Sequence, residues 1–508
     1  MSVVDRTERP DRPATPAAGT LADLAPYLER LFDRVPEEGS YRIEAASGAL
    51  PAGLRGVYYV NGPGRFGRGG VAYRHWLDGD GLVCSLRFGA EGDPAGGVRF
   101  TSRFVRSDKW RDEEAAGRAL YRTFGTSFPG DRLVRGIAIA SPVNVSVYPF
   151  AGRLLAFGEQ GLPWELDPET LETRGEHTFG RRLNPVAPFS AHPNLDPASG
   201  EMFNFGVSFA AERPTLNLYR FAPDGEMVYR RRAPLPYPAS IHDFGLSRRY
   251  AVVFVQPYLL DMAALTAEGA TILDGLSWEP VRGSELLVLD RKSGAEVCRV
   301  PVGRGYVLHQ VNAYDDGDRL VVDLLELEEP VYPDYRPLPD LFAEVAPAHP
   351  VRLVVDPAAG ELVERREVPC TLAADFPAVD PRRWELSTDR FWMLAISATG
   401  RPGRKFLDRV AAVDFGSGTI ADAWQAPAGR YLGGEPVFAP DPERPGGGWI
   451  LCQELDAEAR RAAFLVFDAH DLAAGPVARL PLEGALPPLF HACFVPEAGR
   501  PSPTGSRP

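Results

Sequence analysis

The stretch from Ile241 to Phe254 reads IHDFGLSRRYAVVF, and its pattern predicts a histidine at one end of a buried strand. An apolar residue precedes His242, a turn follows, and the run that begins at Tyr250 is typical of a buried strand. One such histidine is most often a core residue whose ring nitrogens have hydrogen-bond partners within the protein. Three more occur in similar settings, in FSAHPNLD, YVLHQVNAY and LPPLFHACF; they are His192, His309 and His491. We therefore ask whether the four meet at one metal ion.

A turn pattern recurs along the chain. Seven times an apolar run reaches a tight polar turn and a second apolar run follows, which is typical of a β-hairpin. The turns are anchored at Asp78, Asp167, Ala222, Asp290, Asp356, Asp414 and Asp468. The last six anchors are 54 to 68 residues apart, longer than a common propeller blade of about 40–50 residues. Seven such units predict an all-β, seven-bladed β-propeller with elaborated loops, and unrelated hairpins in two β domains are the alternative.

The four histidines keep phase with this repeat. Each lies 19 to 25 residues after the anchor of its unit, and the same offset in the two units without a histidine selects Asp375 and Glu435. Extrapolation places the seventh member near Asn144. Because one position in each blade faces the central axis, we expect these residues to form a ring around it. Scattered core histidines would have no reason to keep phase.

A ring of this composition points to a metal centre. Four neutral imidazoles suit a first-row cation such as Fe, Zn, Cu or Ni. Four histidines would complete a zinc site, whereas Fe(II) takes more ligands and would keep positions free for O2 or substrate. A ligating histidine usually donates its second N–H to a carboxylate or carbonyl. We expect three carboxylates behind the histidines, outside the ligand set: Glu159, in RLLAFGEQG, with Asp375 and Glu435.

These segments resemble the carotenoid cleavage oxygenase family, from about Leu54 to Pro496. The stretches that carry the resemblance are LRGVYYVNGPG, HWLDGDGL, RLLAFGEQGLPWELDPETLETRG, SAHPNLDPASGEMFNFG, IHDFGLS, LHQVNAYDDGD, YLGGEPVFAP and FHACFVP. The resemblance implies a propeller with loops and short helical insertions that form a dome over the metal. It also implies one Fe(2+) per chain, bound by His192, His242, His309 and His491, with Glu159 and Glu435 as outer partners.

Three stretches depart from the family pattern. Asp375, in ADFPAVD, stands where the family usually has a glutamate and is one methylene shorter. The Asn-Thr-Asn-like block before the first glutamate reads Pro142-Val143-Asn144, and an EDDGW-like segment reads PGGGW. The first departure puts a contact to a histidine in question, and the second changes a residue beside the metal.

The resemblance implies a dioxygenase that cleaves a conjugated C=C bond of a carotenoid or apocarotenoid with O2 to give two carbonyl products. A lignostilbene-type stilbene dioxygenase is the alternative. That branch of the family is expected to bind a phenol with a lysine and a tyrosine. The chain has no lysine between residues 110 and 291, which favours a carotenoid or apocarotenoid substrate. A metal-dependent isomerase or hydrolase, and a metal-free propeller that binds a partner at its rim, are further alternatives.

Composition limits the partners and the location. An excess of Asp and Glu (68) over Lys and Arg (55) argues against nucleic acid. Five scattered cysteines without CxxC spacing, no visible signal peptide and no long apolar run indicate a cytoplasmic protein. The segment Phe254–Leu273 predicts either a helix packed on the barrel or a patch that touches a membrane at the substrate tunnel. Leu21–Val35 predicts an amphipathic helix, and we expect residues 21–496 to form one catalytic domain between disordered tails at 1–20 and 497–508.

Overall fold

The computed structural model describes residues 24–497 apart from 45–46, 90–96, 137, 185, 210–212, 267–268, 336–340 and 401–402. The tails predicted to be disordered, 1–20 and 497–508, lie outside the described residues except for Glu497. Their disorder and the boundary of the catalytic domain at residue 21 therefore stay predictions.

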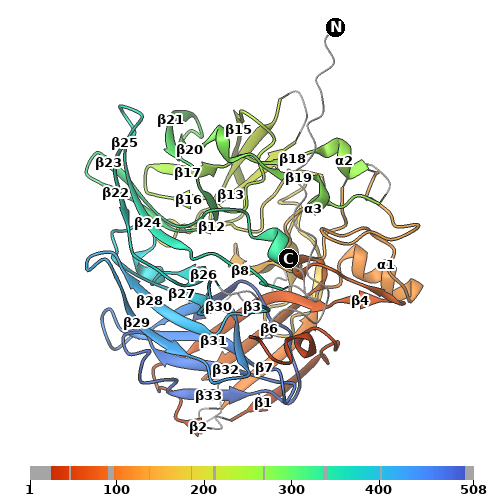
Figure 1. Ribbon diagram of the computed structural model, residues 1–508. Helices are drawn as coiled ribbons and strands as arrows, with labels where there is room; N and C mark the ends of the chain where they lie inside the picture. The colour runs from red at the N-terminus through yellow and green to blue at the C-terminus, as the bar shows by residue number, and fades with distance from the viewer. Residues whose placement is uncertain are drawn as a thin grey trace.

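Seven antiparallel sheets of four or five strands build the fold, which confirms the predicted all-β, seven-bladed β-propeller (Figure 1). The first blade contains β1 (Gly39–Ile43), β7 (Val98–Phe104), β6 (Asp80–Phe88), β3 (Gly56–Arg65) and β34 (Ala492–Pro496). The second contains β11 (Thr173–Glu176), β10 (Trp164–Leu166), β9 (Arg153–Phe157) and β8 (Ser146–Phe150). The third contains β12 (Asn194–Leu195), β13 (Met202–Ser208), β14 (Thr215–Phe221) and β15 (Met227–Pro234).

The remaining blades follow in chain order. The fourth contains β16 (Gly245–Leu246), β17 (Tyr250–Val255), β20 (Ser284–Asp290) and β21 (Glu296–Gly303), and the fifth β22 (Tyr306–Asp316), β23 (Arg319–Leu327), β24 (His349–Asp356) and β25 (Glu361–Glu367). The sixth contains β26 (Ala373–Ala378), β27 (Arg390–Ile396), β28 (Arg409–Asp414) and β29 (Thr419–Gln425). The seventh contains β30 (Arg430–Pro440), β31 (Gly448–Asp456), β32 (Arg461–Asp468), β33 (Ala478–Pro481) and β2 (Ser47–Gly48).

Burial on both faces explains why the middle strands read as unbroken apolar runs. Val252 and Val288 of the fourth blade pack with Val322 and Leu353 of the fifth in one cluster with no solvent exposure. Similar clusters lie between other neighbouring blades. A strand that is covered on both sides has no polar face, so it does not alternate. The packed faces between blades therefore hold the ring together.

The two ends of the chain close the ring in the first blade. Strand β34 pairs antiparallel with β3, with Val495 opposite Val57. The innermost strands of the seven blades are β34, β8, β12, β16, β22, β26 and β30. Because β34 directly follows His491 and is the last strand of the described residues, the site at the centre is complete only when β34 has paired with β3.

Six of the seven turn anchors lie at hairpin turns within blades, as predicted. Asp167, for example, joins β10 to β11 and accepts hydrogen bonds from the backbone N–H of Glu169 and Thr170 at 2.9 and 2.8 Å. The prediction was wrong for the remaining anchor, Asp78. This residue lies in a 3-10 helix, η2 (Trp76–Asp78), where its carboxylate accepts a hydrogen bond from the N–H of His75. The first blade takes its outermost strand, β1, from upstream, so its outermost strand pair, β1 with β7, is not a hairpin of consecutive strands.

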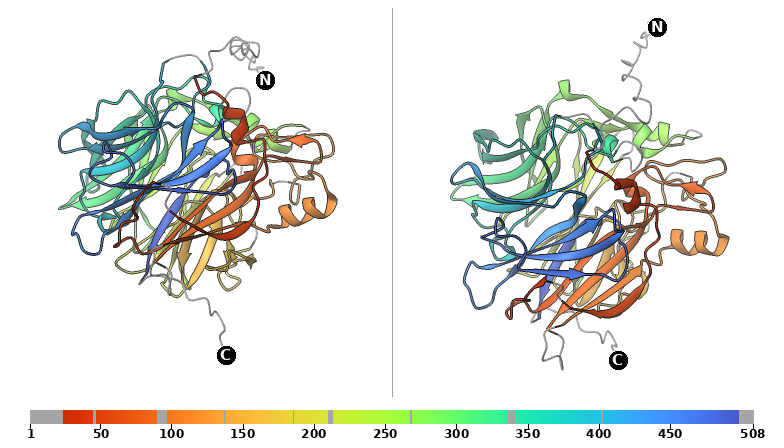
Figure 2. Two further views of the ribbon diagram at one scale, coloured as in Figure 1. Left: turned by 90° about the horizontal axis from the view of Figure 1, so that it is seen from below. Right: turned by 60° about the horizontal axis from the view of Figure 1, so that its bottom comes forward.

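Short helices and two small hairpins lie outside the blades (Figure 2). They are η1 (Leu28–Leu31), α1 (Asp108–Ala116), α2 (Met262–Thr266), α3 (Ile272–Gly275), η3 (Pro280–Arg282), η4 (Tyr332–Asp334), η5 (Pro381–Arg383), the pair β4 (Gly67–Arg68) and β5 (Val71–Ala72), and the pair β18 (Tyr258–Leu260) and β19 (Leu276–Trp278). Within the described residues, Leu21–Val35 holds only η1 instead of a long helix. Tyr27, the residue before η1, has a left-handed backbone (φ 61°), so a helix cannot continue from the preceding residues into η1.

The segment Phe254–Leu273 is no single helix. It runs from the end of β17 through β18 and α2 into α3, and the buried side chains of Tyr258, Leu265 and Ile272 belong to the main apolar cluster. The segment therefore packs on the barrel, as the first of the two predictions for it expected, although not as one helix. The second, that the segment touches a membrane, stays a prediction. In the described part of the chain, no helix is long and apolar enough to cross a membrane.

Candidate metal centre

The four predicted histidines lie together at the centre of the propeller. One ring nitrogen of each lies within 4.8 Å of those of the other three. His192, His242 and His491 precede the innermost strands β12, β16 and β34, and His309 lies within β22. All four side chains are buried, with 4–7% of each residue exposed. Four separate blades therefore converge on a volume that suits a single cation.

Backbone hydrogen bonds between blades place these histidines. The N–H of His491 donates to the carbonyl of Val145 at 3.1 Å, and the N–H of His192 donates to Ser190 Oγ at 2.9 Å. Asp243 accepts from the N–H of Gln310 at 2.8 Å and so ties the residue after His242 to the residue after His309. The spacing of the rings thus depends on contacts that cross from blade to blade.

The three predicted carboxylates lie behind three of the histidines. Glu159 Oε1 lies 2.8 Å from His242 Nδ1, and Asp375 Oδ1 lies 2.5 Å from His309 Nδ1. Glu435 Oε2 lies 3.5 Å from His491 Nδ1 and also accepts from the N–H of Ala492 at 3.2 Å. Each contact uses Nδ1, which leaves Nε2 to face the centre. The shorter Asp375 still reaches its histidine.

The environment sets the charge of the rings. Burial lowers the pKa of His192 well below its usual value, and the neighbouring imidazoles lower it further, so this ring is neutral. Burial also lowers the pKa of His491. For His309 burial acts in the same direction, but the carboxylates of Asp375, Asp243 and Glu435 together outweigh it and raise the pKa. The pKa of Asp375 is lowered, since His309 and hydrogen bonds outweigh the effect of burial.

The donor set fits a borderline first-row cation. His192 Nε2 is buried and has no hydrogen-bond partner among the described atoms, which is costly for a polar atom unless something binds it. His242 Nε2 and His309 Nε2 lie 3.1 Å apart. Imidazole nitrogens that crowd one volume, without a carboxylate in direct position to bind, match the predicted four-histidine metal site.

Two tyrosines that the sequence did not predict also reach this centre. Tyr332 is the first residue of helix η4 and Tyr335 follows its last residue, and the Tyr332 hydroxyl lies 3.1 Å from His242 Nδ1. The Tyr335 hydroxyl donates to Asp375 Oδ2 at 3.0 Å. They lie in a segment without hydrophobic periodicity, and no sequence signal pointed to them.

The N-terminal signature supports the site from the dome, the region outside the blades that contains η2 and η4. His75 caps η2, and its Nε2 lies 2.8 Å from the carbonyl of Tyr332. Asn144, the extrapolated seventh ring position, is buried and donates from Nδ2 to the carbonyls of Leu77 and Gly79 at 2.9 and 2.7 Å. Asn144 therefore holds η2 in place and is engaged with the backbone.

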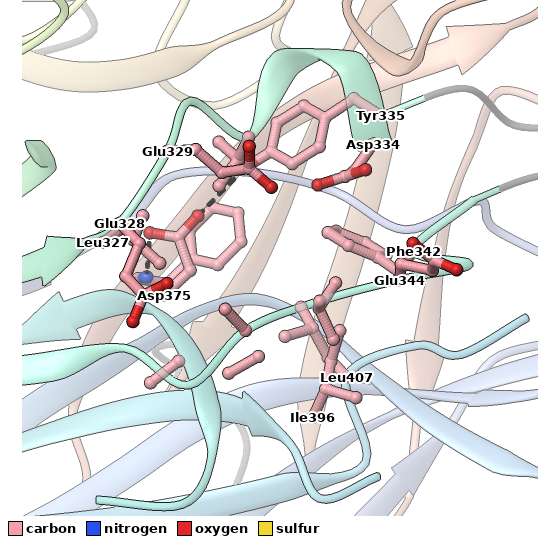
Figure 3. Close-up of a pocket in the computed structure, with 16 residues that line it drawn as sticks. Leu327, Glu328, Glu329, Asp334, Tyr335, Phe342, Glu344, Asp375, Ile396 and Leu407 are labelled. Carbon is pink, nitrogen blue, oxygen red and sulfur yellow. Dashed lines mark hydrogen bonds between the residues drawn. The ribbon is translucent and has the colours of Figure 1, made fainter. Parts of the chain in front are cut away.

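Two cavities approach the centre. One has an apolar part lined by Phe342, Phe376, Ile396 and Leu407, with Asp375 and Tyr335 in its wall, and carboxylates also line it: Glu328, Glu329, Asp334 and Glu344 (Figure 3). The other, of about 240 Å³, includes three of the histidines in its lining and continues along the innermost strands, where Asn194, Gln310 and Val437 line it. The second cavity thus reaches the histidines themselves, whereas the first reaches Asp375, the carboxylate behind His309.

Comparison with known proteins gives close agreement over nearly the whole chain. The family model described as retinal pigment epithelial membrane protein matches residues 32–496. The apocarotenoid-15,15'-oxygenase of Synechocystis sp. is 30% identical, over 92% of this chain and 95% of that protein. The isoeugenol monooxygenase of Pseudomonas putida is 29% identical over 88% of this chain and 93% of its own. The lignostilbene-alpha,beta-dioxygenase isozyme III of Sphingomonas paucimobilis is 26% identical over 88% and 92%.

Solved structures agree equally well. A mutant of the Synechocystis apocarotenoid oxygenase superposes with a TM-score of 0.83 at 27% identity and covers 94% of this chain and all of its own. The cobalt-substituted form of the Synechocystis enzyme superposes with a TM-score of 0.82 at 27% identity, over 92% of this chain and 98% of its own.

Proposed function

The chain belongs to the carotenoid cleavage oxygenase (retinal pigment epithelial membrane protein) family, and we propose that it cleaves an apocarotenoid with O2 at a mononuclear Fe(II) centre. The family and the four-histidine metal site make it an oxygenase that acts on a C=C bond. The finer proposal names His192, His242, His309 and His491 as the iron ligands. The observation that carries it is the convergence of these four buried imidazoles within 4.8 Å.

The outer carboxylates orient the ligands. Bound iron would supply the activation of O2, and the side chains of the protein orient the ligand rings. Glu159, Asp375 and Glu435 face the Nδ1 atoms of three rings, which fixes the tautomer with Nε2 free and holds each ring in place. We propose that both atoms of O2 enter the products, so that one C=C bond gives two C=O groups.

The dome wall aligns the substrate and excludes water. Aromatic side chains lie close to the histidines: Phe376 lies 5.2 Å from the ring of His491 and 5.7 Å from that of His309, between ring centroids. A polyene offers few polar groups, so selection of one double bond depends on the shape of an apolar wall. The cavity bounded by Phe342, Ile396 and Leu407 supplies such a wall.

The lysines support an apocarotenoid over a stilbene. Lys109 is buried and paired with Asp80 and Glu113 at 2.6 and 2.9 Å. Lys405 is buried and donates to the backbone carbonyls of Ala343 and Gly403 at 2.6 and 2.8 Å. Lys292 follows β20, in an outermost hairpin of the fourth blade. No lysine is therefore placed to hold a phenol.

A phenylpropenoid or stilbene is the second candidate. The isoeugenol monooxygenase and the lignostilbene dioxygenase match the chain almost as fully as the apocarotenoid oxygenase does. We also propose a reducing compartment, such as the cytoplasm, because all five cysteines are free.

The test is substrate cleavage by the reconstituted protein. The apoprotein is loaded anaerobically with Fe(II), and an apocarotenal, a hydroxystilbene and isoeugenol are each added with O2 while their absorbance is followed. We expect iron near one per chain and bleaching of the apocarotenal. Bleaching of only the stilbene or isoeugenol would overturn the substrate assignment, and bound iron without any cleavage would overturn the reaction.

Single alanine variants test the ligand set. His192→Ala, His242→Ala, His309→Ala and His491→Ala should each lose most of the iron and the turnover. The matched control is His470→Ala, since His470 is exposed and contacts Arg390 and a backbone carbonyl far from the centre. A ligand variant that kept full iron content and full turnover would contradict the assignment.

A further inference from the structure

One short helix places two phenol groups against the metal centre. Helix η4 carries Tyr332 at its start and Tyr335 at its end, and both side chains are buried. Their hydroxyls meet different ligand pairs, His242 with Glu159 and His309 with Asp375. We propose that Tyr335 is a positioning residue that fixes the Asp375 carboxylate and, through it, the ring of His309; this rests on the proposed metal site.

Both oxygens of Asp375 are occupied by hydrogen bonds. Oδ1 lies 2.5 Å from His309 Nδ1 and also accepts from the N–H of Phe376 at 2.8 Å. Oδ2 accepts from the Tyr335 hydroxyl at 3.0 Å, and Figure 3 shows this contact at the wall of the apolar cavity. A carboxylate held at both oxygens cannot rotate without breaking a bond. The orientation of the His309 ring is therefore fixed from outside its own blade.

The other two outer carboxylates differ in this respect. Glu159 Oε1 faces His242, but Glu159 Oε2 is buried without a hydrogen-bond partner among the described residues. The contacts of Glu435 with His491 Nδ1 and with the N–H of Ala492 both use Oε2. Asp375 alone of the three receives a phenol hydroxyl among the described contacts. Its short side chain is compensated by a donor from the dome.

The backbone of η4 is itself anchored. The carbonyl of Tyr335 accepts from the N–H of Trp76 at 2.7 Å, and the carbonyl of Tyr332 lies 2.8 Å from His75 Nε2. The rings of Trp76 and Tyr335 meet edge to face, 5.4 Å between centroids. Since η2 is in turn held by Asn144, the position of the Tyr335 hydroxyl is set by two other blades. Burial also raises the pKa of Tyr335 far above its usual value, so the hydroxyl stays protonated as a donor.

The hydroxyl has a clear physical role. A carboxylate that accepts a second hydrogen bond is a weaker base, which leaves the shared proton on His309 Nδ1 and keeps His309 Nε2 free for the metal. Loss of the hydroxyl should allow Asp375 to rotate and His309 to follow. Removal of an outer hydrogen-bond partner typically weakens metal binding by about 10–100-fold.

The test measures binding of Co(II) to the full-length apoprotein, so it does not depend on turnover. Tyr335→Phe keeps the ring and removes the hydroxyl. We expect it to weaken Co(II) binding by about tenfold or more and to shift the visible absorption bands of bound cobalt. The matched control is Tyr229→Phe, which removes a buried hydroxyl that donates to the carbonyl of Arg291 at 2.7 Å, away from the centre. This control should leave both readouts unchanged.

A double-mutant cycle separates positioning from general loss of packing. In an Asp375→Ala background, Tyr335→Phe should have no further effect on Co(II) affinity, because the group that it orients is gone. Unchanged Co(II) affinity and spectrum in Tyr335→Phe, or additive effects in the cycle, would overturn the proposal. If the wild type binds cobalt as expected but cleaves no apocarotenal, the proposed function fails while this inference stands.

Discussion

Two histidines of the same site differ in pKa because only one of them has a carboxylate at close range. Burial and neighbouring imidazoles lower the pKa of His192, whereas for His309 the 2.5 Å contact with Asp375, together with Asp243 and Glu435, outweighs burial and raises the pKa. A metal ion binds only the neutral ring. The two ligands therefore enter the metal site from different protonation states.

Metal binding should release a proton, mostly from His309. Because its pKa lies above 6.5, the ring is largely protonated in the apoprotein at pH 6.5, and metal affinity should fall as pH is lowered through that pKa. Calorimetry of Co(II) binding at pH 6.5 in buffers of different ionisation enthalpy would count the proton. Asp375→Asn removes the charge that raises the pKa, so this variant should release less. Equal proton release from both proteins would contradict the assignment.

At the scale of elements, an aspartate at a turn and an aspartate in a buried ion pair between strands have pKa values that are shifted in opposite directions. Asp356 ends β24 and accepts from the N–H of Ala358 and Ala359, and these bonds, with Arg319, lower its pKa. Asp323 of β23 is buried against Arg352 of β24 at 2.8 Å, and burial raises the pKa of Asp323 to about 6. Of the two, only the half-buried turn aspartate Asp356 follows the ordinary rule that a folded protein favours the ionised carboxylate.

The two aspartates predict stability changes of opposite sign with pH. The folded pKa of Asp323 lies above its unfolded value near 3.8, so its contribution is present below pH 4 and is lost as pH rises to about 6. The free energy of unfolding of the wild type, relative to Asp323→Asn, should therefore decrease across that window in urea titrations. The control is Asp356→Asn, for which the wild type should lose its relative advantage as pH falls. Parallel curves would contradict the prediction.

Closure of the ring by β34 should be essential for stability. Val495 is buried opposite Val57, within the cluster between the first and second blades. Val495→Asp would place an unpaired carboxylate there, which should lower the free energy of unfolding by about 3 kcal/mol or more. Val363→Asp is the matched control, since Val363 is half exposed on the outer strand β25 and should change stability by less than about 0.5 kcal/mol. Similar urea midpoints for both would contradict closure by β34.

For the whole molecule, the repeat was predictable because each blade repeats the same local chemistry. Turn aspartates such as Asp290, whose Oδ1 accepts from the N–H of Ser293 at 2.7 Å, mark the hairpins without any tertiary information. The phase of the histidines then located the centre. The first blade broke the pattern, because Asp78 belongs to a dome helix and the strands of that blade come from both ends of the chain.

The dome could not be predicted in the same way. Tyr332 contacts His75 across 257 residues of sequence, in a segment that has neither periodicity nor a turn motif. The contact depends on two loops that meet only when the ring has closed. The lining of the apolar cavity has the same origin, with residues from three stretches around Tyr335, Phe376 and Ile396. Local patterns therefore located the four histidines and the three carboxylates behind them, and missed Tyr332 and Tyr335.

The arrangement of ligands predicts that metal binding stabilises the ring as a unit. His192, His242, His309 and His491 belong to the third, fourth, fifth and first blades, so one ion links innermost strands that are far apart in sequence. An ion that binds only the folded state should add about 2.7 kcal/mol at a concentration 100 times its Kd. The melting temperature should therefore rise with added metal and fall with a chelator.

His192→Ala isolates this effect from ordinary packing. Since His192 Nε2 has no hydrogen-bond partner among the described atoms, its loss should change the stability of the apoprotein little, while the rise in melting temperature with metal disappears. Hydrogen exchange should show where the stabilisation lies. Metal should slow exchange most in β12, β22 and β34, and least in the outer strand β29, which lies in a blade without a histidine ligand. Equal slowing in inner and outer strands would show that the metal does not bridge the blades.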